Sequence, residues 1–307
     1  MNKVLAIGET IYDILFRDGQ PVAAKAGGSM LNTAVSLGRA GIPVEMITEL
    51  GDDQVGRLIS DFLVQNRVST SFIQPVPEFK TPVSLAFLDA QGNAKYSFYK
   101  KYPQERLNID WPLINNGDVV LFGSFYSLSK DIRKKLVDFI KKAKEQGALI
   151  FYDPNIRKNH LAEIQLLMPL IEENIRLADI VRGSDEDFLN LFGLTDNEAI
   201  FNKIQNIGGK CLIITKGNQG VDLLSGTIRL HLDSEKINPV STIGAGDSFN
   251  AGLIYGLMNN GISVEDLVHI SPEKWKELLN FGVTFAADVC KGYDNYISEA
   301  FRLELHG

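Results

Sequence analysis

Short apolar runs alternate with longer amphipathic stretches along most of this 307-residue chain, and this alternation limits the possible folds more than any other feature. Runs bounded by Gly, Asp or Pro are typical of strands buried on both faces of a sheet. The runs are Val4–Ile7, Val44–Thr48, Val119–Phe122, Ala148–Tyr152, Ile180–Val181 and Leu212–Thr215. The stretches between them predict helices over Ser29–Ala40, Gln54–Asn66, Ser129–Gln146, Leu161–Leu170, Asn197–Asn206, Asp247–Asn259 and Pro272–Val289. Together they predict an α/β fold: a Rossmann-like, mostly parallel sheet with helices on both faces.

One region breaks this alternation, because its apolar positions follow a strand period with no helix between them. Val83–Leu88 and Ala94–Tyr99 flank the polar segment Asp89–Asn93, a pattern that predicts a β-hairpin. Ile11–Phe16 and Val22–Ala24 form a second strand pair across a Gly-Gln-Pro turn. Strands without helical crossovers do not join a parallel sheet easily, so we expect a small separate sheet over the large one. We therefore predict a single domain, 1–307, with a β-lid formed from segments within about 10–26 and 70–100.

Composition excludes several classes of function. Lys and Arg number 31 against 38 Asp and Glu, for a net charge of −7, so the chain lacks the basic footprint of a nucleic-acid or anionic-membrane binder. No apolar run approaches the roughly 18 residues of a membrane span. Cys211 and Cys290 cannot form a disulfide framework, and the histidines lack zinc-ligand spacing. We expect a protein of the reducing cytoplasm.

The segment Ile243–Phe249 is the sharpest local signal, because a glycine-rich turn there leads directly into a predicted helix. Glycines let the backbone fold tightly, so the amides of Gly244, Ala245 and Gly246 can converge with the helix N-terminus on a phosphoryl group or another anion. Asp247 lies in the first helical turn, where a carboxylate also complements the helix dipole. Taken alone, the turn fits a plain loop as well as a phosphate site. Walker and dinucleotide fingerprints are absent from the sequence.

Three further polar clusters stand beside predicted strands or helices. Gly27 and Gly28 open a helix in which Asn32 and Ser36 share a polar face, and their spacing favours exposure of that face to solvent. The other two clusters follow buried strands, at 153–157 and 215–220. Ligands of parallel sheets gather outside the carboxyl ends of strands, so these positions favour binding.

In combination, the two glycine clusters and their order resemble the signatures of the ribokinase-like (PfkB) carbohydrate kinases, over nearly the whole chain. The resemblance implies a Rossmann-like core with a β-lid, and phosphoryl transfer from ATP to a sugar hydroxyl. It implies that Asp247 is the catalytic base and that Gly244, Ala245 and Gly246 form the anion hole. The cluster that ends in Arg157 resembles the version in fructokinases and 2-keto-3-deoxygluconate kinases, where the arginine reaches the substrate or the transferred phosphate.

The same resemblance implies the remaining site residues. The positions that would bind the sugar are Asp13, Gly28, Asn32 and Phe98, together with Asp247. The positions that would bind the nucleotide are Ser184, Thr215, Gly217, Gly220, Gly244, Gly246 and Asn280. Asp187 would support Mg²⁺ through water, with Glu186 as a rival.

Two departures from the family pattern bear on cofactors. Ser241 stands where the second signature normally begins with an Asp that helps to bind an activating monovalent cation, so K⁺ activation is left open. The Asn-x-x-Glu element is Ser184-Asp185-Glu186-Asp187 here, which shortens its carboxylate by one methylene.

We expect an enzyme that uses MgATP, with fructose ahead of 2-keto-3-deoxygluconate, ribose or another ketose as the sugar. A nucleoside kinase, a catalytically silent sugar or nucleotide sensor on the same fold, and an interaction scaffold are the alternatives. Exposed lid strands suggest a homodimer formed through the lid.

Overall fold

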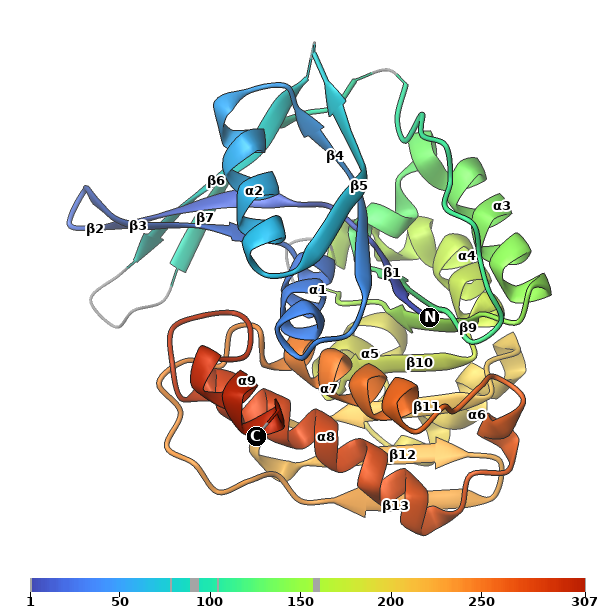
Figure 1. Cartoon of the computed structure of the whole chain (residues 1–307). Helices are drawn as coiled ribbons and strands as arrows, with labels where there is room; N and C mark the ends of the chain where they lie inside the picture. The colour runs from blue at the N-terminus through green and yellow to red at the C-terminus, as the bar shows by residue number, and fades with distance from the viewer. Residues whose placement is uncertain (1, 78, 89–93, 104, 157–160, 307) are drawn as a thin grey trace.

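The computed structural model describes the chain except for residues 1, 78, 89–93, 104, 157–160 and 307. The described residues form one large sheet, one small sheet and helices on both sides of the large one (Figure 1). The order of the large sheet is β13 (Ile228–Leu232), β12 (Val221–Ser225), β11 (Cys211–Thr215), β10 (Ile180–Ser184), β9 (Leu149–Asp153), β8 (Val119–Gly123), β1 (Val4–Ile7), β4 (Val44–Gly51) and β5 (Val68–Val76). From β11 to β5 neighbouring strands are parallel, whereas β12 and β13 are antiparallel.

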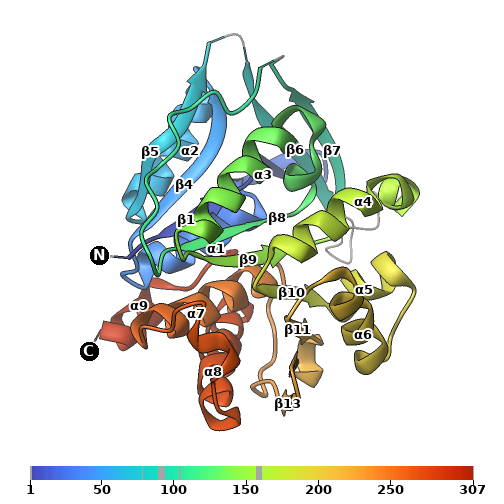
Figure 2. The same cartoon turned by 90° about the vertical axis from the view of Figure 1, so that its right-hand side faces the viewer.

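Two hydrophobic cores lie on opposite faces of this sheet, because successive residues of a strand point to opposite sides. Val4 and Ala6 belong to one core, and Leu5 and Ile7 to the other. The first core is covered by α1 (Ser29–Arg39), α2 (Gln54–Gln65), α7 (Ala245–Asn259), α8 (Pro272–Cys290) and α9 (Glu299–His306). The second is covered by α3 (Lys130–Glu145), α4 (Leu161–Leu177), α5 (Asp185–Phe192) and α6 (Asn197–Ile207), and Figure 2 separates the two layers.

The small sheet projects from the body as a lid (Figure 1). Its order is β3 (Gln20–Gly27), β2 (Ile11–Arg17), β6 (Lys80–Leu88) and β7 (Ala94–Lys101). β2 pairs with β3 and β6 with β7 in antiparallel fashion, while β2 and β6 are parallel. β3 runs into α1 with only Gly28 between them, so the lid is joined directly to a helix of the body.

The predicted α/β fold class, the two-sided helix layers and the small extra sheet are confirmed. Residues 68–76 form the edge strand β5 of the large sheet, and the second pair of small-sheet strands, β6 and β7, lies further along the chain, between Lys80 and Lys101. α4 continues past the predicted end at Leu170 to Leu177, with Pro169 inside it, because Ile171 and Ile175 extend its buried stripe. Among the described residues, no helix is long and apolar enough to cross a bilayer.

Candidate functional site

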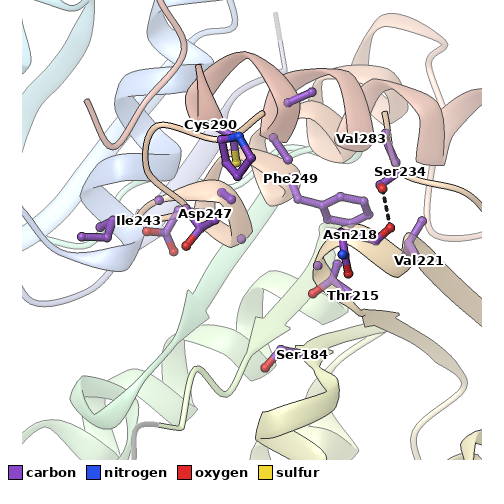
Figure 3. Close-up of a pocket in the computed structure, with 18 of the residues that line it drawn as sticks. Ser184, Thr215, Asn218, Val221, Ser234, Ile243, Asp247, Phe249, Val283 and Cys290 are labelled. Atoms are coloured by element: carbon purple, nitrogen blue, oxygen red, sulfur yellow. Dashed lines mark hydrogen bonds between the residues drawn. The ribbon is translucent and has the colours of Figure 1, made fainter. Parts of the chain in front are cut away.

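A cavity of about 810 Å³ opens at the carboxyl end of the parallel strands (Figure 3). One wall is apolar and comes from α8, with Val283 and Cys290 facing Phe249 of α7. Another comes from the carboxyl ends of β10 and β11, including Ser184 and Thr215. The turn before α7 closes one end of the cavity. A parallel sheet collects ligands at this edge, because its helices point their N-termini there.

The turn before α7 requires glycine at its tightest point. Gly244 caps the helix in the left-handed region, at φ 82°, and α7 begins at Ala245. A Cβ on Gly244 would lie 2.4 Å from the carbonyl oxygen of Asn295, so no larger residue fits without a shift of backbone. Because the first amides of a helix have no partners in their own helix, the turn and Gly246 place a partial positive charge at the cavity. The Ala245 amide also donates to the Thr242 carbonyl oxygen, at 3.3 Å.

Asp247, in the first turn of α7, is held by three residues of α1. Ser29 Oγ donates to its Oδ1 at 2.6 Å, Asn32 Nδ2 donates to its Oδ2 at 2.8 Å, and Thr33 Oγ1 donates to its carbonyl oxygen at 2.9 Å. The two glycine clusters, more than two hundred positions apart, therefore meet through a carboxylate of fixed orientation. Asp247 also lines the cavity.

The contact between α1 and α7 shows that the prediction of a solvent-exposed polar face on α1 is wrong. Asn32 is 5% exposed and Ser36 is fully buried. Ser36 Oγ lies 3.2 Å from Ser248 Oγ, so the polar face of α1 packs against α7 rather than against water. Spacing predicted which residues share the face but could not predict that α7 covers it.

The lid contributes a row of side chains that crosses its strands. Asp13, Ser84 and Phe98 are register partners and so share one face, and Ser84 Oγ donates to Asp13 Oδ1. Phe98 is 47% exposed and stacks on Tyr96 with ring centroids 5.9 Å apart. Tyr96 reaches the cavity, a residue that sequence reasoning missed.

Most of the predicted nucleotide positions do line the cavity. Ser184, Thr215, Gly217 and Gly220 are all among its walls, and Gly217 begins the 3₁₀ turn η3 (Gly217–Gln219). Asn280 is exposed on α8 and stands outside the lining. The part of α8 that does line it begins at Val283, one turn further along.

The two rival carboxylates for a metal have different surroundings. Asp187 is 6% exposed and forms a capping box with Ser184: its Oδ2 accepts from the Ser184 amide and hydroxyl at 2.6 Å, and its Oδ1 accepts from the Ile156 amide at 2.6 Å. Burial raises the pKa of Asp187, and nearby Asp153 adds to the rise. Glu186 is exposed and lines the cavity. Within the described ranges, no group of three or more acidic, His or Cys side chains could hold a metal by itself.

Such an arrangement suits Mg²⁺, which keeps most of its waters and binds through substrate phosphates and one or two carboxylates. The acidic edge of the cavity at Glu186 and Asp187 therefore fits a metal that arrives with a nucleotide.

Arg182 was missed because the predicted strand stopped at Val181. It lies in β10 at 6% exposure and lines the cavity. A charged residue directly after a buried apolar run is the signal that could have found it, since Arg is rarely buried without a partner. Its partner is Asp153, with Arg182 Nη1 3.0 Å from Asp153 Oδ2. Arg157 lies outside the described residues.

A glycine turn at a helix N-terminus, beside an oriented carboxylate in a cavity at the carboxyl edge of an α/β sheet, is the arrangement of an enzyme that transfers a phosphoryl group. The chain matches the pfkB family carbohydrate kinases over residues 1–298. It is 32% identical over 263 residues to a fructokinase of Rhizobium leguminosarum bv. trifolii, covering 83% of this chain and 79% of that protein. It is 27% identical over 268 residues to a fructokinase of Escherichia coli, covering 86% and 87%. The protein belongs to the pfkB family and is a sugar kinase, as its signatures predicted.

Solved structures share the fold across the whole chain. The crystal structure of fructokinase from Vibrio cholerae O395 in its fructose-, ADP- and calcium-bound form superposes with a TM-score of 0.85 at 21% identity, covering 99% of both chains. Aminoimidazole riboside kinase from Salmonella enterica, complexed with aminoimidazole riboside and an ATP analogue, gives 0.81 at 20% identity, again over 99% of both.

Proposed function

We propose that this protein is a fructokinase that transfers the γ-phosphoryl group of MgATP to a hydroxyl of fructose, giving fructose 6-phosphate. The observation that carries the proposal is the Asp247 carboxylate, oriented by Ser29 and Asn32 beside the glycine turn of α7. Its relatives at 32% and 27% identity are named fructokinase, which favours fructose over other sugars.

In the proposed reaction, Asp247 accepts the proton of the sugar hydroxyl while the oxygen of that hydroxyl bonds to the γ-phosphorus. The bond from that phosphorus to the oxygen shared with ADP breaks, and ADP leaves with the electron pair. The transition state is loose and spreads charge over the phosphoryl oxygens, so the amides of Gly244, Ala245 and Gly246 act by electrostatic stabilisation. The hydrogen bonds from Ser29 and Asn32 make the Asp247 carboxylate a weak base. A loose transition state tolerates a weak base, because the hydroxyl gives up its proton late in the reaction.

The lid would hold the sugar against this centre. Asp13 and Gly28, with Asn32 behind Asp247, would bind sugar hydroxyls, and Phe98 would pack on the sugar ring. Phe98 is half exposed and shares the lid face of Asp13, so its ring is available to pack on a sugar face. Closure of the lid would exclude water and align the hydroxyl with the phosphoryl group.

The nucleotide would occupy the cavity along β10 and β11, with its phosphates at the glycine turn. Ser184, Thr215, Gly217 and Gly220 line that course. Asn280 would help to close the adenine site, although it does not line the cavity. Mg²⁺ bound with ATP would neutralise part of the phosphate charge. Glu186 and Asp187, which both line the cavity, would hold its waters. Arg157, from the family resemblance, would reach the phosphoryl group or the sugar.

A monovalent cation is a separate question, because Ser241 lacks the carboxylate that such a site needs. Ser241 Oγ accepts from the Ile243 amide at 3.2 Å, which occupies the side chain locally. We therefore propose that turnover does not depend on K⁺.

We also propose a cytoplasmic homodimer. Cys211 and Cys290 are free and buried, which suits a reducing compartment. The lid face opposite Asp13 carries Phe87 at 42% and Tyr99 at 63% exposure, which suits burial against a second copy. A sedimentation experiment that finds a monomer at every concentration would remove this part of the proposal.

A coupled-enzyme screen tests the proposed function. MgATP is supplied with fructose, 2-keto-3-deoxygluconate, ribose and adenosine, each with K⁺ or with tetramethylammonium. Fructose should give the highest kcat/KM, with little effect of K⁺. Highest turnover with adenosine would identify a nucleoside kinase instead. No ATP consumption with any sugar, while ATP still binds, would favour the silent sensor.

A further inference from the structure

The cavity carries more negative than positive charge, which is unusual for a site that takes a polyphosphate. Its acidic lining residues are Asp185, Glu186, Asp187, Glu235 and Asp247. Among the described residues that line it, the basic side chain is Arg182. Within the described lining, amides and one guanidinium therefore supply the fixed positive potential that attracts the phosphates.

The guanidinium of Arg182 packs directly against the glycine turn. A Cβ on Gly246 would lie 2.8 Å and 3.0 Å from its two terminal nitrogens, so a side chain at this position would displace the guanidinium. Arg182 Nη2 also donates to Thr215 Oγ1 at 2.7 Å, at the end of the neighbouring strand. Arg182 thus lies between two segments that line the course of the phosphates.

Asp153, the last residue of β9, holds the guanidinium of Arg182 in place. Its Oδ2 accepts from Arg182 Nη1 at 3.0 Å and from Asn250 Nδ2 at 2.6 Å, and its Oδ1 accepts from the Asn155 amide at 3.0 Å. Burial raises the pKa of Asp153, although the Arg182 charge opposes this rise. The carboxylate is satisfied by these donors and serves as an anchor.

Arg182 itself retains unused donors. A guanidinium has five N–H groups, and Asp153 and Thr215 each receive one of them. Within the described part of the chain, its buried Nε has no hydrogen-bond partner. Nε is enclosed by protein, so the donors that could reach an anionic ligand in the cavity are the N–H groups of Nη1 and Nη2 that Asp153 and Thr215 do not receive. Burying a charge is costly unless its hydrogen-bonding capacity is used, and such a ligand would use more of it.

We propose that Arg182 is a catalytic residue whose guanidinium contacts the oxygens of the phosphoryl group in transfer, from the β10 side of the Gly244–Gly246 turn. This inference rests on the proposed kinase reaction and adds a residue to it. Arg182 moves no proton: it offsets the charge on the phosphoryl oxygens while the bond to the sugar oxygen forms and the bond to ADP breaks. The planar fork of Arg suits two phosphoryl oxygens better than the point charge of Lys.

The test compares Arg182→Lys with the double variant Arg182→Met, Asp153→Asn, which avoids leaving a buried carboxylate unpaired. The control is Arg133→Met with Glu173→Gln. Arg133 is also a mostly buried arginine paired with a carboxylate, at 2.5 Å, but it joins α3 to α4 on the far side of the sheet.

The Arg182 double variant should lose about 100- to 1000-fold in kcat, the usual effect of removing one donor to transition-state charge, with KM for the sugar unchanged. Arg182→Lys should fall between it and the wild type, and the control should keep wild-type kcat. Near-wild-type kcat in the double variant would overturn the proposal. If the double variant does not fold, Arg182→Lys becomes the test. Wild-type kcat in Arg182→Lys would overturn the proposed contact between the guanidinium and the phosphoryl oxygens.

The affinities for ATP and AMP, measured by calorimetry, distinguish contact between Arg182 and the phosphates from a purely structural role of Arg182. This measurement does not depend on turnover. ATP affinity should fall in the Arg182 variants while AMP affinity stays unchanged, because AMP lacks the phosphates that reach the turn. An equal loss for both nucleotides would mean that Arg182 only shapes the pocket. If the wild type phosphorylates no sugar, the proposed function fails, yet this comparison still tests whether Arg182 meets the terminal phosphates.

Discussion

Two substitutions of Asp247 should separate its chemical role from its structural one. In Asp247→Asn the new amide keeps the shape of the carboxylate: its oxygen can accept from Asn32, and its nitrogen can donate to the Ser29 hydroxyl, which rotates to accept. In Asp247→Ala both donors lose their acceptor. Asn32 is 5% exposed and Ser29 is 7% exposed, so water does not readily replace it.

The expected magnitudes follow from these contacts. The Ser29 hydroxyl can turn to another acceptor, but the Asn32 amide cannot, and one buried unsatisfied donor costs about 1–3 kcal/mol. For a chain of this length, that corresponds to a Tm lowered by about 2–6 °C in Asp247→Ala. Asp247→Asn should keep nearly wild-type Tm. Both variants lose the proton acceptor, whose contribution is typically about 10²–10⁴-fold in kcat.

The assays are thermal unfolding without ligands, ATP affinity by calorimetry, and kcat with fructose in a coupled assay. ATP affinity should stay near the wild-type value in both variants, since in the proposed reaction the phosphates contact amides and Arg182 rather than Asp247. Turnover by Asp247→Asn within about tenfold of wild type would refute the carboxylate as proton acceptor. Equal Tm values for the Asn and Ala variants would refute the hydrogen-bonding argument, whatever the activities.

Three further predictions concern the turn, the lid and an edge strand. Gly244→Ala places a Cβ on a residue with φ 82° and against the Asn295 carbonyl oxygen. The substitution should lower the free energy of unfolding by at least about 1–3 kcal/mol, measured by denaturant titration. Unchanged stability would contradict the close packing. Lys25→Met removes the bond from lid strand β3 to Asn295 Oδ1, 3.0 Å long, and should raise KM for the sugar but not for ATP in steady-state kinetics; equal effects on both would count against coupling through the lid. The hydrogen bond that His231 Nδ1 donates to Asp222 Oδ1 raises the pKa of His231, so folding favours the charged imidazole. Relative to His231→Gln, the wild type should lose Tm as pH rises from about 6 through that raised pKa, and a constant difference would exclude the effect.

The sequence allowed prediction of those parts that depend on local pattern. Buried strands such as Val4–Ile7 and the amphipathic helix α3 follow from spacing alone, and the turn at Gly244 follows from the glycines that lead directly into α7. Edge strands were harder: β13 alternates partly buried and exposed residues over only five positions, which is little signal for a strand. The missed helix α5 begins with three acidic residues, a pattern that suggested ligand chemistry rather than a helix start.

The site shows why residue identity predicts chemistry less well than it predicts structure. Asp153 ends a strand, and Asp187 and Asp247 lie in the first turns of helices, all at the carboxyl edge of the sheet, so position alone gives them equal claims to catalysis. Their partners separate them: Asp187 caps α5, Asp153 anchors Arg182, and Asp247 accepts two side-chain donors at the mouth of the cavity. A carboxylate such as Asp187, whose two oxygens accept from backbone amides and the Ser184 hydroxyl, has little capacity left for a substrate. Asp247, held from a second helix, is oriented and lines the cavity. Because those partners come from segments distant in sequence, folding decides which of these carboxylates can react.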